Sequence, residues 1–340
     1  MKNTTSQIVA RCLLTLLGAA LFVTLSFAQS EPGEEIFEPA ELGFVESTVL
    51  GFVEGLTEYL PISSTGHLIL TAHFLDLSKE TVLQDEAGNT LYLETPSKEN
   101  PGGTPLTLKA AIDAYLIIIQ LGAIAAVVIV YWNRLLSIIY GLLGKDPKGL
   151  LLLRNLILAF IPAVVVGLLL EDVIEDYLFG NEPVILALFV GGLGILVVDR
   201  WHNKYGKDDS SPELHELTPL QCLFIGGMQC VAMWPGTSRS MMTIIGGYLV
   251  RLSPTKAAEF SFLLGLVTLS AASVYKGYKV GLPLIDAFGW WMPILGCLVA
   301  AISATLAVKW MVGYLGKHGL AVFGYYRIVL ALVLAWVFYY

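Results

Sequence analysis

Two carboxylates, a helix-breaking proline and three consecutive hydroxyl residues interrupt the apolar segment 44–75, in the stretch Glu54-Gly55-Leu56-Thr57-Glu58-Tyr59-Leu60-Pro61-Ile62-Ser63-Ser64-Thr65-Gly66-His67. A helix would place Glu54 and Glu58 on one face, because they are four positions apart. Carboxylates within an apolar segment are costly and normally face a cavity or a cation. Non-helical backbone at membrane depth is tolerated only where the protein or a water-filled cavity provides hydrogen-bond partners for its N–H and C=O groups. The stretch therefore predicts a re-entrant helical hairpin over 44–75.

A second apolar segment, 219–250, is broken in the same way, at Trp234-Pro235-Gly236-Thr237-Ser238-Arg239-Ser240. Arg239 is the only cation between Gln221 and Val250. Its planar guanidinium matches the geometry of a phosphate or a carboxylate. Two interpretations stay open: Arg239 binds an anionic ligand, or it forms an ion pair with Glu54 or Glu58 that only holds the hairpins together.

Composition indicates that the chain is a membrane protein. Of 340 residues, 56% are hydrophobic and 14% are charged, whereas soluble domains carry about 25% charged residues. This excludes a soluble enzyme, a disordered chain and a disulfide scaffold, and the continuous apolar runs fit a β-barrel poorly. We expect an all-α polytopic membrane protein with six transmembrane helices, at 111–132, 155–170, 183–199, 256–275, 290–308 and 320–338.

The first residues resemble a targeting segment. A basic start, an apolar centre and the small-x-small pattern Ser26-Phe27-Ala28 predict a signal peptide over 1–28. An uncleaved first span is the alternative. In both cases the acidic segment 29–43 would be delivered outside.

Lys and Arg gather in alternate loops, which sets the expected orientation. The loop 133–154 is basic and is expected in the cytoplasm, while the loop after 170 is acidic and is expected outside. Lys276 and Lys279 fall on the outer side and depart from the rule. The resulting topology places both mature termini outside.

The two halves of the chain repeat one pattern, a hairpin followed by three spans. Repeat one covers 44–199 and repeat two 219–340, in opposite orientations, and a shared offset aligns Glu54 with Gln229 and Ser63 with Ser238. Inverted repeats of this kind place a binding site near the bilayer midplane, where the broken elements meet. The segment 76–108 has no counterpart and is interpreted as an external insertion in a single membrane domain, 44–340.

The residues at the two breaks favour phosphate chemistry. Hydroxyls, backbone N–H groups and one arginine suit an oxyanion, and paired carboxylates can hold a divalent cation or act as a general base. His67 has two interpretations, a satisfied buried histidine or a member of this cluster.

Both motifs resemble the signatures of the bacitracin-resistance family of undecaprenyl-diphosphate phosphatases. The first signature is matched by Glu54-x-x-x-Glu58 with Pro61 to His67, and the second by Pro235 to Ser240. The similarity continues through Gln120-Leu121-Gly122 and Glu259-Phe260-Ser261-Phe262-Leu263, so it covers most of 44–340.

The resemblance implies an enzyme that removes the terminal phosphate of a C55 isoprenoid diphosphate. The product is the monophosphate carrier lipid for peptidoglycan synthesis, and the implied site opens to the periplasm of the bacterial inner membrane. In this resemblance Ser64 is the nucleophile, Glu58 its activator and Arg239 the phosphate clamp, while His67 is an acid/base group or itself the acceptor. The implied substrate contacts are Ser63, Thr65, Gly66, Gly236, Ser238, Ser240 and Gln229. Glu54 and Glu58 would hold Mg²⁺ or Ca²⁺, and a homodimer is left open.

Three features depart from the family pattern: Met241 after Ser-Arg-Ser, Val267 where proline is frequent, and the long segment 76–108. None removes a reacting group, so they bear on the shape of the site.

Two other functions compete with this interpretation. A second lipid-phosphatase family has a nucleophilic histidine soon after its Ser-Arg pair, whereas the first histidine after Arg239 here is His318. A carrier-lipid transporter is the other rival, because inverted repeats with broken helices are a transporter architecture. A transporter would need Arg239 but has no use for an activated serine.

Overall fold

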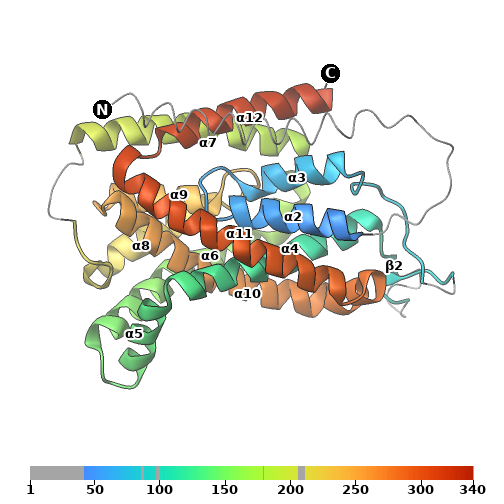
Figure 1. Ribbon diagram of the computed structural model, residues 1–340, viewed down its shortest axis with the longest axis horizontal. Coiled ribbons are helices and arrows are strands. Elements are labelled where there is room, and N and C mark those ends of the chain that lie inside the picture. Colours follow the sequence, from blue (N-terminus) through green and yellow to red (C-terminus); the bar gives the residue numbers. More distant parts are fainter. Residues whose placement is uncertain are drawn as a thin grey trace. The chain divides into compact units, whose positions relative to one another are not determined.

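The computed structural model describes residues 42–85, 88–96, 100, 102–178, 180–205 and 211–339. The predicted signal peptide, 1–28, and the acidic segment up to 41 lie outside the described residues. The described chain is almost entirely helical (Figure 1). Six of its helices are long and apolar enough to cross a membrane. The fold class expected from the sequence, an all-α polytopic membrane protein, is confirmed.

The six long helices match the predicted spans and extend beyond most of them. Each is an apolar run of at least 19 residues, close to the length that crosses a hydrocarbon core. They are α4 (Leu108–Val130), α6 (Pro147–Leu178), α7 (Asn181–Tyr205), α10 (Pro254–Phe288), α11 (Trp291–His318) and α12 (Ala321–Tyr339).

Both predicted hairpins are present as pairs of short helices. The first is α2 (Phe44–Thr57) with α3 (Ser64–Phe74), and the second is α8 (Pro219–Val231) with α9 (Arg239–Leu249). Thr218 caps the start of α8 by accepting a hydrogen bond from the backbone N–H of Gln221, which satisfies a donor that has no partner inside the helix. Each helix pair is interrupted where the sequence places its proline, glycine and hydroxyl residues.

The two hairpins pack in corresponding ways. Helix α2 packs against α11, and α8 packs in the matching way against α6. Gly51 and Gly226, which the offset that aligns Glu54 with Gln229 also aligns, make these contacts close. A Cβ on Gly51 would lie 2.5 Å from the Gly296 carbonyl oxygen, and one on Gly226 would lie 2.3 Å from that of Ala159. The remaining spans pair across the two halves, α4 with α10 and α7 with α12. Both hairpins are therefore held by spans of the opposite half.

The basic loop predicted over 133–154 contains an additional helix, α5 (Trp132–Leu142). Its apolar side chains include the exposed Trp132, Ile139 and Leu142. Asp146 then caps α6, accepting hydrogen bonds from the backbone N–H groups of Lys148 and Gly149. A short 3-10 helix, η1 (Leu214–Glu216), precedes the second hairpin.

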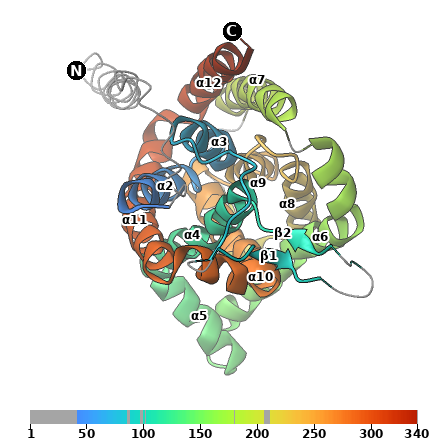
Figure 2. The ribbon, with the colours of Figure 1, turned by 90° about the vertical axis from the view of Figure 1, so that its right-hand side faces the viewer.

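The insertion 76–108 forms a small β structure beside the start of α4. Its strands β1 (Tyr92–Glu94) and β2 (Thr104–Pro105) pair antiparallel, and β1 contacts α10 (Figure 2). Lys109 ties the insertion to α4 through an ion pair of 2.9 Å with Glu80, both side chains being more than half exposed. In Figure 1, β2 and α5 lie at opposite ends of the described helices. The insertion and the basic loop thus lie at opposite ends of the described helices, and the side of the membrane that each one faces stays a prediction.

Candidate functional site

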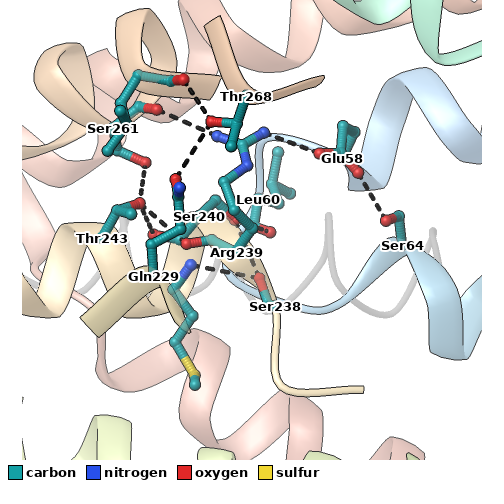
Figure 3. A network of polar contacts seen from close by, with 12 residues as sticks. Glu58, Leu60, Ser64, Gln229, Ser238, Arg239, Ser240, Thr243, Ser261 and Thr268 are labelled. Atoms are coloured by element: carbon teal, nitrogen blue, oxygen red, sulfur yellow. Dashed lines mark hydrogen bonds and ion pairs between the residues drawn. The ribbon is translucent and has the colours of Figure 1, made fainter. Parts of the chain in front are cut away.

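The breaks of the two hairpins meet through Glu58 and Arg239. Arg239 donates from Nη2 to Glu58 Oε1 at 2.8 Å, and the two side chains are only 12% and 6% exposed (Figure 3). A second bond, from the Ser240 hydroxyl to the Leu60 carbonyl at 2.8 Å, joins the same two breaks. Residues far apart in the sequence therefore form one polar centre between the hairpins.

Ser64 completes this centre on the side of the first hairpin. Its hydroxyl donates to Glu58 Oε2 at 2.7 Å, so one carboxylate contacts both the serine and the arginine. Ser64 is the first residue of α3 and is half-buried. A hydroxyl hydrogen-bonded to a carboxylate is the arrangement by which a general base activates a serine nucleophile.

Several groups fix the guanidinium of Arg239. Its Nη1 donates to the Ser261 carbonyl of α10 at 3.1 Å, and its Cζ lies 5.3 Å from the centroid of the Tyr59 ring. Gly265 leaves room for it, because a Cβ there would lie 2.1 Å from Nη1. The Nε atom is buried and has no hydrogen-bond partner among the described residues. The Nε donor of the guanidinium is therefore left to interact with a ligand.

Glu54 and Gln229, the residues aligned by the repeat, are both buried in the structure. Glu54 is 0% exposed, and neither of its carboxylate oxygens has a hydrogen-bond partner among the described residues. Gln229 contacts the Thr268 hydroxyl at 3.3 Å through Oε1, while its Nε2 has no partner there. Glu54 interacts electrostatically with Glu58 and Arg239. Because buried polar groups are normally hydrogen-bonded, these atoms indicate a place for a polar or charged ligand.

Ser63 and Ser238 act as helix caps in the structure. Ser63 accepts a hydrogen bond from the Gly66 N–H at 3.4 Å, and Ser238 accepts one from the Met241 N–H at 3.3 Å. Ser238 also contacts the Ser240 hydroxyl at 3.0 Å. Their hydroxyls are therefore engaged in shaping the two breaks, and their predicted role as substrate contacts stays a prediction.

The two predicted glycines allow close packing of the breaks against α7. A Cβ on Gly66 would lie 2.9 Å from a methyl group of Leu188, and one on Gly236 would lie 2.6 Å from the Val184 carbonyl oxygen. Gly236 also has φ +91°, which L side chains rarely adopt. Thr65, the second residue of α3, is half-buried.

His67 lies beside this centre with both ring nitrogens engaged. Its Nδ1 is 2.7 Å from the Ser63 carbonyl oxygen, and its Nε2 is 2.7 Å from the Tyr326 hydroxyl. A carbonyl oxygen can only accept, so Nδ1 donates, and in the neutral imidazole Nε2 then accepts from Tyr326. His67 thus holds the first break against α12.

The sequence reasoning did not identify several polar residues around the breaks. Arg327 of α12 is fully buried and donates to the Gly236 carbonyl at 2.8 Å. Thr243 and Ser261 contact each other through their hydroxyls at 2.6 Å behind Arg239. Arg327 is the single cation in the apolar run 320–338, and this signal was available in the sequence. Ser261 stood out only as part of the stretch Glu259 to Leu263 that resembles the family, and Thr243 carried no comparable signal.

Known proteins are similar to this chain over most of its length. Residues 47–333 match the family described as "Bacitracin resistance protein BacA". A protein of Sorangium cellulosum named "Undecaprenyl-diphosphatase" is 40% identical over 292 residues, which cover 86% of this chain and 85% of that protein. A protein of Aquifex aeolicus with the same name is 36% identical over 291 residues, covering 85% and 96%. The family match and the matched lengths together show that this chain belongs to the BacA bacitracin resistance family.

Proposed function

We propose that the protein is an undecaprenyl-diphosphate phosphatase, which hydrolyses the C55 isoprenoid diphosphate to the monophosphate carrier lipid and phosphate. The names of the relatives support this activity. The observation that carries it is the position of Glu58, whose two oxygens contact the Ser64 hydroxyl and the Arg239 guanidinium. A serine paired with a carboxylate has no purpose in a site that only binds or transports a lipid.

The first chemical step follows from these contacts. Ser64 Oγ attacks the terminal phosphorus as its proton passes to Glu58 Oε2, and the bond from that phosphorus to the bridging oxygen breaks. The electron pair stays on the bridging oxygen, which leaves as the lipid monophosphate. Arg239 neutralises the negative charge on the phosphoryl oxygens while the phosphoryl group parts from the bridging oxygen. Such charge neutralisation is a main task of a protein in phosphoryl transfer.

The second step regenerates the enzyme. Glu58 first releases its proton to solvent and then takes one from a water molecule that attacks the phosphoserine. The bond from phosphorus to Ser64 Oγ breaks, Glu58 returns the proton to Oγ, and phosphate leaves. One water is consumed and one proton is released in each turnover.

The engagement of His67 supports Ser64 as the acceptor of the phosphoryl group. Both imidazole nitrogens already have partners, Ser63 and Tyr326, whereas the Ser64 hydroxyl contacts only the carboxylate that would activate it among the hydrogen bonds described for it. A histidine nucleophile would have to give up one of its two bonds. In this proposal His67 positions the first break and takes no part in bond formation.

The residues present fit a divalent cation. Glu54 has two buried oxygens without partners among the described residues, and Glu58 is four positions away on the same helical segment. In this proposal Glu54 and Glu58 would hold Mg²⁺ or Ca²⁺ with water and phosphate oxygens as further ligands, because the described residues contain no group of three or more histidine, cysteine or acidic side chains that could hold a metal by itself. Such a cation supplies charge neutralisation at the diphosphate.

The proposed location is the bacterial inner membrane, with the site open to the periplasm and both mature termini outside. The excess of Lys and Arg in the 133–154 loop supports this orientation. A C55 chain stays in the bilayer, because each CH₂ moved into water costs about 0.8 kcal/mol. The substrate therefore enters laterally from the lipid.

Phosphate release from undecaprenyl diphosphate by the purified protein tests the proposal. We expect Ser64→Ala and Glu58→Gln to lower kcat by about a thousandfold or more, since each removes a group that acts in bond formation. Thr48→Ala serves as the matched control, because that hydroxyl bonds only within its own helix among the described contacts. Hydrolysis by both variants at the wild-type rate would refute the reaction centre, and lipid binding without hydrolysis by the wild type would favour a transporter. A phosphoenzyme trapped on Ser64 would identify the acceptor.

A further inference from the structure

Two neighbouring residues of α12 each contact one of the hairpin breaks. The Tyr326 hydroxyl bonds His67 in the first hairpin, and the Arg327 guanidinium bonds the Gly236 carbonyl in the second. We propose that Tyr326 and Arg327 are positioning residues that align the two breaks, so that Ser64 and Arg239 meet at Glu58. This inference rests on the proposed phosphatase function, because its consequence is measured as a catalytic rate.

Tyr326 acts on the first break through His67. The rings of Tyr326 and His67 stack with an interplanar angle of 1° and centroids 5.6 Å apart. The opposite side of the imidazole donates from Nδ1 to the Ser63 carbonyl at 2.7 Å. Ser63 has φ 71°, a conformation that costs a non-glycine residue about 1–3 kcal/mol. The Tyr326–His67–Ser63 chain thus holds the strained residue that immediately precedes Ser64.

Arg327 acts on the second break directly. Its Nη2 donates to Gly236 at 2.8 Å and to the Ala187 carbonyl of α7 at 3.0 Å. Gly236 lies three residues before Arg239. These hydrogen bonds therefore hold the turn before Arg239 against α7 and α12, in the position from which Arg239 contacts Glu58.

The burial of Arg327 is difficult to explain by stability. The side chain is 0% exposed, and its Nε and Nη1 have no hydrogen-bond partner among the described residues. Burying a charge with incomplete hydrogen bonding is unfavourable, and an apolar side chain of similar size is often at least as stable. Gly191 of α7 makes space for it, since a Cβ there would lie 2.4 Å from Nη2. The fold therefore keeps a buried Arg327 that lowers its stability. This is expected if the bond from Arg327 to the Gly236 carbonyl is needed to align the second break.

The helix geometry explains how one dipeptide reaches both breaks. With 3.6 residues per turn, neighbouring side chains on a helix point about 100° apart. Tyr326 therefore faces the first hairpin while Arg327 faces the second. The described hydrogen bonds of both residues go to His67 and to backbone carbonyls, none to Ser64, Glu58 or Arg239. Their role is accordingly one of alignment.

The first test uses conservative variants of the full-length protein in detergent with undecaprenyl diphosphate. Tyr326→Phe removes one hydroxyl, and Tyr325→Phe is its matched control, because Tyr325 is 62% exposed. We expect kcat to fall about tenfold in Tyr326→Phe and about a hundredfold in Arg327→Lys, with KM within twofold of wild type, because small misplacements of reacting groups are costly. Tyr325→Phe should match wild type.

The second test moves the guanidinium without replacing it. Gly191→Ala places a methyl group against Nη2, whereas Gly194→Ala on the same helix has open space around its Cβ. We expect Gly191→Ala to lower kcat about tenfold and Gly194→Ala to leave it unchanged. The thermal midpoint of each variant, and kcat per folded molecule, separate alignment from folding.

Two outcomes would overturn the inference. One is that Tyr326→Phe and Arg327→Lys both have a kcat per folded molecule within twofold of the wild-type value. The other is that Gly191→Ala and Gly194→Ala have the same kcat. In either case wild type and Tyr325→Phe still release phosphate, so the proposed function stands. Absence of phosphate release from wild type and Tyr325→Phe as well would refute the function itself, and the positioning role with it.

Discussion

Ser63 and Ser238 share one unusual backbone conformation at equivalent points of the two hairpins. Their φ and ψ angles are 71° and 101° in Ser63, and 76° and 114° in Ser238. Each caps a helix, α3 or α9, and the first residue of that helix is Ser64 in one case and Arg239 in the other. The repeat therefore gives the candidate nucleophile and the candidate phosphate clamp the same local geometry, and both reach Glu58.

Arg239→Lys should lower kcat/KM by about 10²–10³-fold. A lysine ammonium can contact Glu58 or the Ser261 carbonyl, but it lacks the planar fork that reaches both, and losing one stabilising donor costs about that much. Initial rates of phosphate release measure the effect. Arg251→Lys is the control, because Arg251 is exposed. A loss of less than threefold in Arg239→Lys would show that the fork is not required.

Glu54→Gln should weaken the response to divalent cations. The Glu54 carboxylate has no hydrogen-bond partner among the described residues. If it holds the ion, replacing it should raise the Mg²⁺ or Ca²⁺ concentration for half-maximal activity about 10- to 100-fold. The measurement is a titration of chelator-treated protein. Glu46→Gln, on the first turn of the same helix, should titrate as wild type does. Identical titrations of Glu54→Gln and wild type would place the ion elsewhere.

Gly226→Ala and Gly227→Ala should have opposite effects on stability. The new methyl group would lie 2.3 Å from the Ala159 carbonyl oxygen in the first variant, but in open space in the second. Overpacking should therefore destabilise Gly226→Ala by about 1–3 kcal/mol, whereas the higher helix propensity of alanine should stabilise Gly227→Ala by up to about 1 kcal/mol. Thermal midpoints in detergent would decide this, and equal midpoints would contradict the close contact of α8 with α6.

Asp146→Asn should destabilise the protein at neutral pH but not in acid. A hydrogen bond from the Ser137 hydroxyl, and further bonds from the backbone N–H groups of Gly149 and Lys148, hold the pKa of the Asp146 carboxyl below its usual value. A carboxyl with a lowered folded pKa stabilises the fold above its unfolded pKa, about 3.9, and that stabilisation disappears as the pH falls through the folded pKa.

Thermal midpoints of wild type and Asp146→Asn between pH 7 and pH 3 test this prediction. The gap between them should be largest at pH 7 and should narrow below about pH 4. Ser137→Ala should shift the narrowing to higher pH, since it removes the main cause of the lowered pKa. A gap that is independent of pH would indicate that the Asp146 charge does not stabilise the cap.

The sequence by itself determined the spans, the two broken hairpins and the types of residue that lie at the breaks. Each of these depends on local information: the length of an apolar run, a proline and glycine within it, and charged groups that membrane depth permits only at a functional site. For this reason Glu54, Glu58, Ser64 and Arg239 stand out in the amino-acid sequence alone. The helix α5 does not, because the charges of the basic loop indicate its side of the membrane and say nothing of its backbone.

Only the tertiary structure decided which of these groups touch and what aligns them. The sequence left open whether Arg239 faces Glu54 or Glu58, and the packing of the hairpins against α11 and α6 selects Glu58. The sequence also gave no reason to expect a contact of Tyr326 with His67 or of Arg327 with Gly236. Such contacts depend on the separations and rotations of helices distant in the chain, which close packing sets and which no local pattern encodes.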